Sequence, residues 1–173
     1  MLKNILFIVL LLTASVSFGQ RYAYVDSKYI LENMDDYKEA QIELNAMSKK
    51  WQATVEAKMT ELDRMRRAFD AEKILLTKSL QEQRSTEIKS KEKEIRDYQR
   101  QKFGVDGELF KKRQELIQPL QDDIFNAIKD LAKEKSYALV FDKGKHSNIL
   151  FANPKYDKSD AILRKLGYSA KDK

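Results

Sequence analysis

The sequence predicts a mostly helical α+β protein, in which a long antiparallel coiled-coil hairpin projects from a small body of three short strands and a C-terminal helix. The composition is the first observation, because 35% of the residues are charged and only 5 are glycine and 2 are proline, as in long helices. Second, apolar residues recur three or four positions apart through the middle of the chain, which is the pattern of a coiled-coil seam. Third, both ends of the chain alternate as strands do, so the helices between them form an insertion.

Residues 1–19 have the layout of a secretory signal peptide. Lys3 supplies a positive charge, an apolar run follows from Ile5 to Leu12, and small residues lead up to Gly19. We therefore expect export and cleavage after Gly19. An uncleaved membrane anchor is the alternative, but no basic stop-transfer cluster follows the apolar run. The chain has no cysteine, so we expect neither a lipid-modified cysteine nor a disulfide.

The body is expected to comprise residues 20–34 and 119–173, with the hairpin inserted between these segments. The first segment holds a strand and a short helix. The second holds the end of the long helix, two further strands and a closing helix. The three strands are expected at Arg21–Asp26, Tyr137–Phe141 and Ile149–Ala152.

So small a body buries little apolar surface in one copy, so we expect it to be stabilised by oligomerisation. The candidate contacts are apolar and aromatic side chains on the three expected strands. These oligomerisation candidates are Tyr22, Tyr24, Val25, Leu139, Phe141, Ile149 and Phe151.

The hairpin is expected over residues 35–118, with its turn near residue 77. Ser79 and Glu82 have the spacing of a capping box, so the second helix is expected to start at Ser79. Lysines interrupt the apolar seam of this second helix. We therefore expect the hairpin to be marginally stable alone and flexible.

Two sites in the second long helix carry residues that disfavour a helix, namely the pair Gly104 and Gly107 and, further on, Pro119. We interpret both sites as kinks in a continuing helix, because the apolar period persists through them. The glycine pair is a candidate hinge, and ordinary surface glycines are the alternative. A second apolar stripe needs a further partner, most simply another subunit; it comprises Phe103, Phe110, Ile117, Ile124 and Leu131.

Several segments together resemble the Skp/OmpH family. They are Tyr22–Asp26, Gln118–Leu120 in the second long helix, Ala132–Lys143, and Ile149–Pro154 before the closing amphipathic helix. None of these motifs is catalytic, and each alone is weak. Their order, with a signal peptide before them and a charged helical hairpin between them, is fairly specific, and the resemblance spans the mature chain.

The resemblance implies a homotrimer whose strands join in a central β-body, from which three hairpins extend like tentacles around a cavity. It also implies an ATP-independent holdase chaperone of the gram-negative periplasm, which binds unfolded outer-membrane proteins in that cavity and prevents their aggregation. A coiled-coil envelope adaptor or scaffold without chaperone activity is the alternative. An adaptor should have a regular, strongly apolar seam, whereas lysines interrupt this one.

The expected hairpin tip is basic, since eight basic and four acidic residues between Arg64 and Lys91 give a net charge of +4. Such a tip suits long-range attraction of anionic clients or contact with an anionic membrane surface. An ordinary solvated helix surface is the alternative. The candidate client or lipid contacts are Arg64, Arg66, Arg67, Phe69, Lys73, Ile74, Leu75, Leu76, Lys78 and Arg84.

The sequence does not predict an enzyme, a metal site or a cofactor site. His146 is the single histidine, and the chain has no cysteine, so nucleophilic triads and zinc sites lack their usual residues. Nor is there a glycine-rich phosphate loop. The net charge of +6 could attract nucleic acid, but the export signal and the acids interleaved with the bases argue against that partner.

Overall fold

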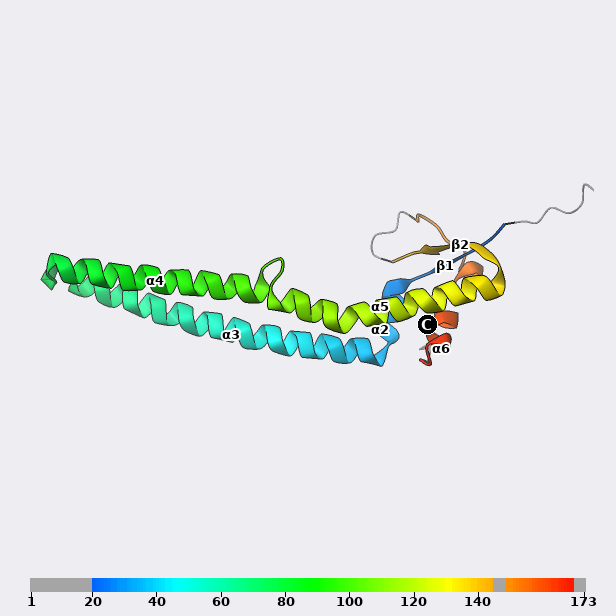
Figure 1. Cartoon of the computed structure of the whole chain (residues 1–173), viewed down its shortest axis with the longest axis horizontal. Helices are drawn as coiled ribbons and strands as arrows, with labels where there is room; N and C mark the ends of the chain where they lie inside the picture. The colour runs from blue at the N-terminus through cyan, green and yellow to red at the C-terminus, as the bar shows by residue number, and fades with distance from the viewer. Residues whose placement is uncertain (1–19, 145–148, 170–173) are drawn as a thin grey trace, which may run out of the picture. The chain divides into compact units, whose positions relative to one another are not determined.

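The computed structural model describes residues 20–144 and 149–169 (Figure 1). The predicted signal peptide and His146 lie outside the described residues. The contacts divide the chain into two units. The hairpin unit is Met34–Asp123, and the body unit is formed by the segments before and after it. The predicted class, α+β and mostly helical, is confirmed.

The hairpin unit is built from two long antiparallel helical segments (Figure 1). Helix α3 spans Asp35–Glu72, and a 3₁₀ turn, η1 at Lys73–Leu75, reverses the chain. Helix α4, Lys78–Phe103, then returns alongside α3. Helix α5 spans Glu108–Lys135 and contributes its residues up to Asp123 to this unit.

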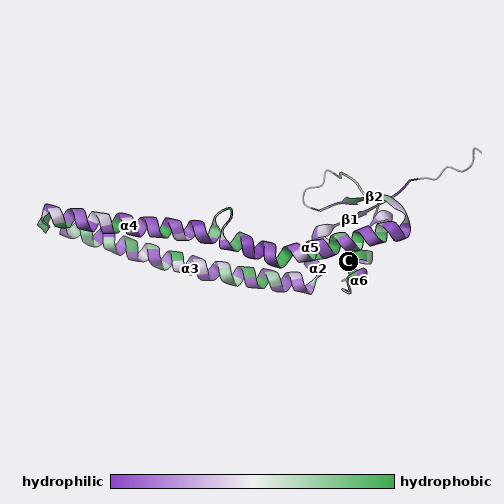
Figure 2. Ribbon diagram, in the orientation of Figure 1, coloured by the Kyte–Doolittle hydropathy of each residue, from purple (hydrophilic) through white to green (hydrophobic). Residues whose placement is uncertain are grey.

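Two small apolar clusters hold the hairpin together, and both helices are otherwise hydrophilic over most of their surface (Figure 2). Near the turn, Leu62 of α3 packs against Ile88 and Ile95 of α4. Toward the other end, Ala40 and Leu44 pack with Ile117 of α5. A seam this narrow buries little apolar area, so polar contacts between the helices carry more weight than in a globular core.

The glycine pair ends a helix rather than kinking it, so that prediction was wrong. Residues 104–107 leave the helical path as a loop between α4 and α5 (Figure 1). A Cβ on Gly104 would lie 2.4 Å from the carbonyl oxygen of Arg100, and one on Gly107 would lie 2.8 Å from the backbone nitrogen of Gly104. Backbone atoms cannot yield to such contacts, so the loop requires glycine at both positions.

If the four loop residues are not counted, the apolar residues of α4 and α5 follow one continuous heptad repeat. Tyr98 of α4 and Leu109 of α5 are eleven positions apart in the chain, and the four loop residues reduce this to seven along the helical path. Leu116 follows after another seven residues. Leu109 and Leu116 both pack against the apolar cluster around Leu44, so α5 continues the seam that α4 began.

Two further predictions concern Pro119 and the start of α4. Helix α5 continues through Pro119, as predicted. The N-cap of α4 was predicted two residues too late, because Thr77 and not Ser79 caps the helix: the Thr77 side chain accepts a hydrogen bond from the Leu80 amide at 3.4 Å. The Leu80 amide, one of those that the start of a helix leaves unpaired, is therefore satisfied by the N-cap side chain.

The body unit contains a two-stranded parallel sheet. Strand β1, Arg21–Val25, pairs with strand β2, Tyr137–Asp142, and Tyr24 lies opposite Phe141. The Lys158 amide donates to the Tyr24 carbonyl at 2.9 Å, on the segment that follows the turn η2, Pro154–Tyr156. Residues from both ends of the chain thus meet in one layer.

The predicted third strand is not formed among the described residues. Ile149–Ala152 carries no strand ladder, and Leu150 and Phe151 are 102% and 83% exposed. Alternation predicts a strand only where a neighbouring strand is placed to form a ladder with it. In the described residues the segment does not join the ladder of β1 and β2.

Two short helices cover the body core. Helix α2, Ser27–Asn33, packs against helix α6, Ser159–Lys165, and Ile30, Ile162 and Leu163 are fully buried. The buried Ser159 hydroxyl accepts from the Asp26 amide at 2.9 Å and donates to Asp157 at 2.6 Å. This hydroxyl joins the start of α6 to the end of β1.

Asp142 at the end of β2 makes a second polar connection. Its carboxylate accepts from the Ser27 amide at 3.0 Å, the Ser27 hydroxyl at 2.6 Å and the Gly144 amide at 2.8 Å. Partial burial alone would raise the pKa of Asp142, but these hydrogen bonds outweigh burial and lower the pKa. The ionised carboxylate therefore stabilises the folded body.

Deleting residues 104–107 tests the loop. Joining Phe103 directly to Glu108 should give one continuous helix in the same heptad phase. We expect unchanged or stronger helical circular dichroism and a melting temperature within about 4 °C of the parent, which corresponds to ~1 kcal/mol. Deleting only residues 105 and 106 is the control, because a closed helix would then be rotated by about 200° and mispacked. Loss of helical signal in the four-residue deletion would contradict the interpretation.

Replacing Asp142→Asn should destabilise the body at neutral pH by about 1 kcal/mol. Hydrogen bonds to a fully buried carboxylate would contribute more, but this carboxylate is partly exposed. Because the folded pKa is lowered, the parent holds this stability above the ordinary aspartate pKa and loses it as pH falls through the folded pKa. Melting temperatures of parent and variant should therefore differ at pH 7 and converge as the pH falls below the folded pKa of Asp142. Asp130→Asn is the control, and a difference that does not change with pH refutes the assignment.

Candidate functional site

The hairpin turn presents two aliphatic side chains to solvent. Ile74 and Leu75 lie in η1 and are 92% and 86% exposed, whereas Leu76 is half-buried. Large apolar side chains at this exposure cost free energy in water, and neighbouring ones form a surface suited to apolar contact. Of the apolar tip candidates, these two are the accessible ones.

One side chain ties the turn that carries them. The Gln81 amide group donates to the carbonyl oxygens of Lys73 at 2.8 Å and Leu76 at 3.1 Å, which flank the two exposed residues. Its two donors thereby satisfy carbonyls that the end of a helix leaves unpaired. Sequence reasoning missed Gln81, since a glutamine eight positions after Lys73 follows no capping pattern.

Phe69, the remaining apolar candidate, is turned inward. It is half-buried against the cluster of Leu62, Ile88 and Ile95. The Lys73 ammonium lies 5.7 Å from its ring centroid, which is within the range of a cation–π contact. Phe69 therefore supports the tip as part of its core.

The basic candidates divide into paired and unpaired cations. Arg66 forms an ion pair with Glu92 of the opposite helix at 2.6 Å, Arg67 pairs with Asp63, and Arg84 lies 3.9 Å from Glu87. Among the described residues, no ion pair is formed by three others, which leaves them able to attract anions: Arg64, Lys73 and Lys78.

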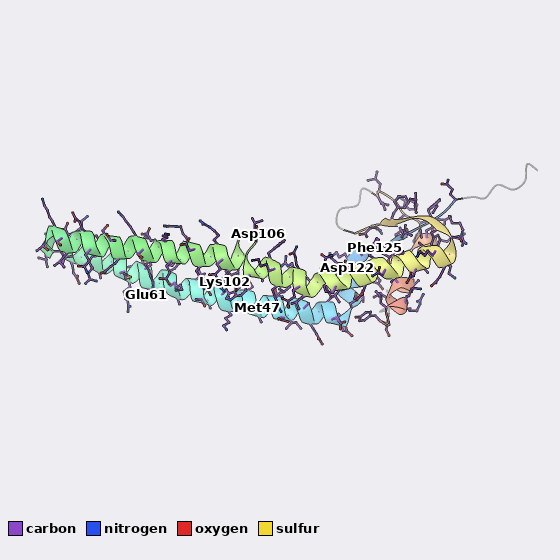
Figure 3. All side chains as sticks on the ribbon, viewed as in Figure 1. Met47, Glu61, Lys102, Asp106, Asp122 and Phe125 are labelled. Carbon is purple, nitrogen blue, oxygen red and sulfur yellow. The ribbon has the colours of Figure 1, made fainter. Side chains whose placement is uncertain are left out.

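Ion pairs between α3 and α4 fix the hairpin behind the tip. Lys91 lies 2.9 Å from Glu61, and Lys58 pairs with Glu94. The hydrogen bond from Lys91 lowers the pKa of Glu61, and the one from Lys58 lowers the pKa of Glu94. Lys91, one of the lysines that interrupt the apolar seam in the sequence, therefore bridges the two helices. Glu61 is marked in Figure 3.

A second cluster surrounds Lys102, beside the loop. Its ammonium lies 5.0 Å from the Trp51 ring centroid and 5.6 Å from that of Tyr98, and 2.5 Å from a Glu108 oxygen. Phe103 meets Trp51 edge to face at 6.0 Å. Figure 3 places Asp106 on the loop, on the side of α4 away from α3. The base of the loop is thus held by aromatic and charged contacts.

The body unit carries an apolar concavity of about 360 Å³. Of the seven oligomerisation candidates, Val25 is buried in the core and Leu139 is exposed outside the concavity. Leu150, which sequence reasoning left out, is fully exposed beside Phe151. The other five candidates together line the apolar concavity: Tyr22, Tyr24, Phe141, Ile149 and Phe151.

The described part of the chain has neither a metal-binding cluster nor a helix suited to crossing a membrane. Across residues 20–144 and 149–169, no three histidine, cysteine or carboxylate side chains gather closely enough to hold a metal ion. None of the helices described is both long and apolar enough to cross a membrane. The accessible features are the tip, the loop and the body surface.

Comparisons with known proteins agree with one another. The sequence profile of a family described as outer membrane protein (OmpH-like) matches residues 21–166. A protein of Aquifex aeolicus (strain VF5) without an assigned function is 25% identical over 160 residues, which cover 92% of this chain and 94% of that protein. A crystal structure of a candidate outer membrane chaperone (OmpH-like) from Caulobacter crescentus CB15 has a TM-score of 0.67 at 17% identity. It covers 87% of this chain and 85% of that chain, which shows a shared fold.

The ion pairs across the hairpin can be tested by a double-mutant cycle on Arg66→Ala and Glu92→Ala. Because the two side chains touch across α3 and α4, the double variant should lose less thermal stability than the sum of the single variants. The coupling should shrink between 20 mM and 1 M NaCl, since Arg66 is exposed and Glu92 is partly exposed, so that salt screens the pair. Arg66→Ala combined with Glu43→Ala is the additive control. A cycle with no coupling at low salt would contradict the role of these pairs.

Proposed function

Because this chain belongs to the OmpH-like family of outer membrane proteins, we propose that it is an ATP-independent holdase chaperone, which binds unfolded outer-membrane proteins and prevents their aggregation. The crystal structure of the candidate OmpH-like outer membrane chaperone from Caulobacter crescentus CB15 supports the same proposal, because this chain shares its fold. The chemistry of a holdase needs no reactive group. It needs accessible apolar surface, weak contacts and an attraction for clients.

The observation that carries this proposal is the tip turn. Ile74 and Leu75 are almost fully exposed at a turn that Gln81 holds in one conformation. Unpaired Lys73 and Lys78 flank them, so apolar contact and positive charge occur together. Exposed apolar residues of this kind bind unfolded segments without sequence specificity, and positive charge raises the rate of encounter with anionic chains.

We also propose where the protein acts and how its copies assemble. We propose that residues 1–19 are removed after export and that the mature chain works in the periplasm. We further propose a homotrimer, in which the apolar body concavity of each copy is covered by another copy and clients are held between the hairpins. The tips are proposed to contact anionic membrane surfaces through the same unpaired cations.

An aggregation assay tests the central activity. The mature chain from Gln20 should keep a urea-unfolded outer-membrane barrel protein soluble after dilution, without ATP, as followed by light scattering. A stable oligomer with no effect on scattering would overturn the holdase and favour the alternative, a coiled-coil envelope adaptor or scaffold.

The double variant Ile74→Ser/Leu75→Ser should weaken client binding about tenfold, because a tenfold change needs only ~1.4 kcal/mol and each side chain is worth about that much or more when buried. The affinity of a fluorescently labelled unfolded client measures this change. Val105→Ser is the matched control, since Val105 is 87% exposed on the loop and outside the tip. Equal affinity of the tip variant and the parent would remove the tip from the proposal.

A further inference from the structure

The body unit contains a second concavity, separate in character from the apolar one. Its volume is about 340 Å³, near the lower end of the range for small-molecule sites. Its lining combines cations with tyrosines, and no carboxylate is among the described residues that form it. These residues are Gln20, Arg21, Tyr22, Tyr137, Lys155, Tyr156 and Lys158.

Three segments build this concavity. They are the start of β1, Tyr137 at the start of β2, and the turn η2 with the residues after it (Figure 1). The Asn153 side chain accepts from the Lys155 amide at 3.0 Å and so caps η2. The Lys158 amide donates to the Tyr24 carbonyl at 2.9 Å, and the rings of Tyr22 and Tyr156 lie 5.2 Å apart. These contacts fix both walls before any ligand is present.

The three cations of the lining are held without an anionic partner. The Arg21 guanidinium lies 5.5 Å from the Tyr137 ring centroid, and the Lys158 ammonium donates to the Lys155 carbonyl at 3.2 Å. Across the described residues, no ion pair involves any of the three. By contrast, Lys28 and Lys165 of the same unit pair with Glu32 and Glu134. Three like charges around one hollow repel one another, and a bound anion would relieve that repulsion.

We propose that this concavity binds a phosphate monoester, with Arg21, Lys155 and Lys158 as its ligands. At neutral pH a phosphate monoester carries a charge between about −1.5 and −2 on three acceptor oxygens. A carboxylate has one charge and two oxygens, and would leave part of the positive charge unmatched. Arginine and lysine are both suited to phosphate, the first by its planar donors and the second as a point charge.

The tyrosines indicate that the phosphate is carried by a small polar group. Tyr22, Tyr137 and Tyr156 offer hydroxyl groups for hydrogen bonds and ring faces for stacking. The concavity has room beyond a phosphate, because its volume is several times the ~30 Å³ that a water molecule occupies. The same phosphate chemistry could be presented by a soluble sugar phosphate or by a lipid headgroup. This site lies in the body and does not depend on the proposed client contacts at the hairpin tip.

Titration calorimetry on the mature chain tests the site, with glucose 6-phosphate and inorganic phosphate as probes and glucose as the uncharged control. We expect saturable binding of the phosphates at one site per chain, weaker at higher salt, and no binding of glucose. The double variant Lys155→Gln/Lys158→Gln should lose at least tenfold in affinity, and Arg21→Gln should lose affinity as well. The control Lys129→Gln/Lys133→Gln removes two exposed body cations outside the lining and should bind as the parent does.

Circular dichroism and chain mass confirm that each variant is folded and assembled as the parent is.

Vesicles show whether the bound phosphate group comes from a lipid or from a soluble molecule. They contain either phosphatidic acid, which is a phosphate monoester, or phosphatidylglycerol, which is a diester. Monoester-selective vesicle binding that the lining variants lose assigns a lipid headgroup, whereas binding of sugar phosphate alone assigns a soluble ligand. The proposal is overturned if neither phosphate probe binds the parent, or if the lining variants bind as tightly as the parent.

Discussion

The parallel pairing of β1 with β2 is the interaction on which the rest of the chain depends. Two parallel neighbours cannot be joined by a tight turn, so the chain between them must leave the sheet and return. Here that crossover comprises α2, the whole hairpin unit and α5. The antiparallel course of the two long helical segments follows from this requirement. Polar contacts of Ser159 and Asp142 then join the strand ends to the short helices that cover the core.

The same pairing leaves the sheet incomplete. The sheet of the described residues has two strands, Ile149–Ala152 adds no third strand to it, and Leu150 and Phe151 face solvent. The hairpin also buries little apolar surface, because its seam is narrow and ion pairs bridge its helices. The body and the tip turn both carry neighbouring apolar side chains that are more than four-fifths exposed, Leu150 with Phe151 and Ile74 with Leu75. Assembly of copies and capture of unfolded chains are the two roles we propose for them.

The sequence was sufficient for the class and the hairpin, since helical periodicity and strand alternation are local patterns. It could not decide the glycine loop, because the eleven positions from Tyr98 to Leu109 fit either three turns of a continuous helix or one heptad plus a four-residue loop. It overcounted strands at Ile149–Ala152, because alternation does not supply a partner. Gln81 was also missed, since its contacts depend on how the turn closes. The cationic concavity arises only when both chain ends meet.

The central claim is that one copy cannot cover its own sheet. The mass of the mature chain in solution, measured by light scattering at micromolar concentration, tests it most directly. We expect the mass of three chains, maintained on dilution, because the exposed apolar residues of each body need a neighbouring copy. A stable, soluble monomer would contradict this account, since the apolar concavity and the exposed side chains of Leu150 and Phe151 would then remain open to water.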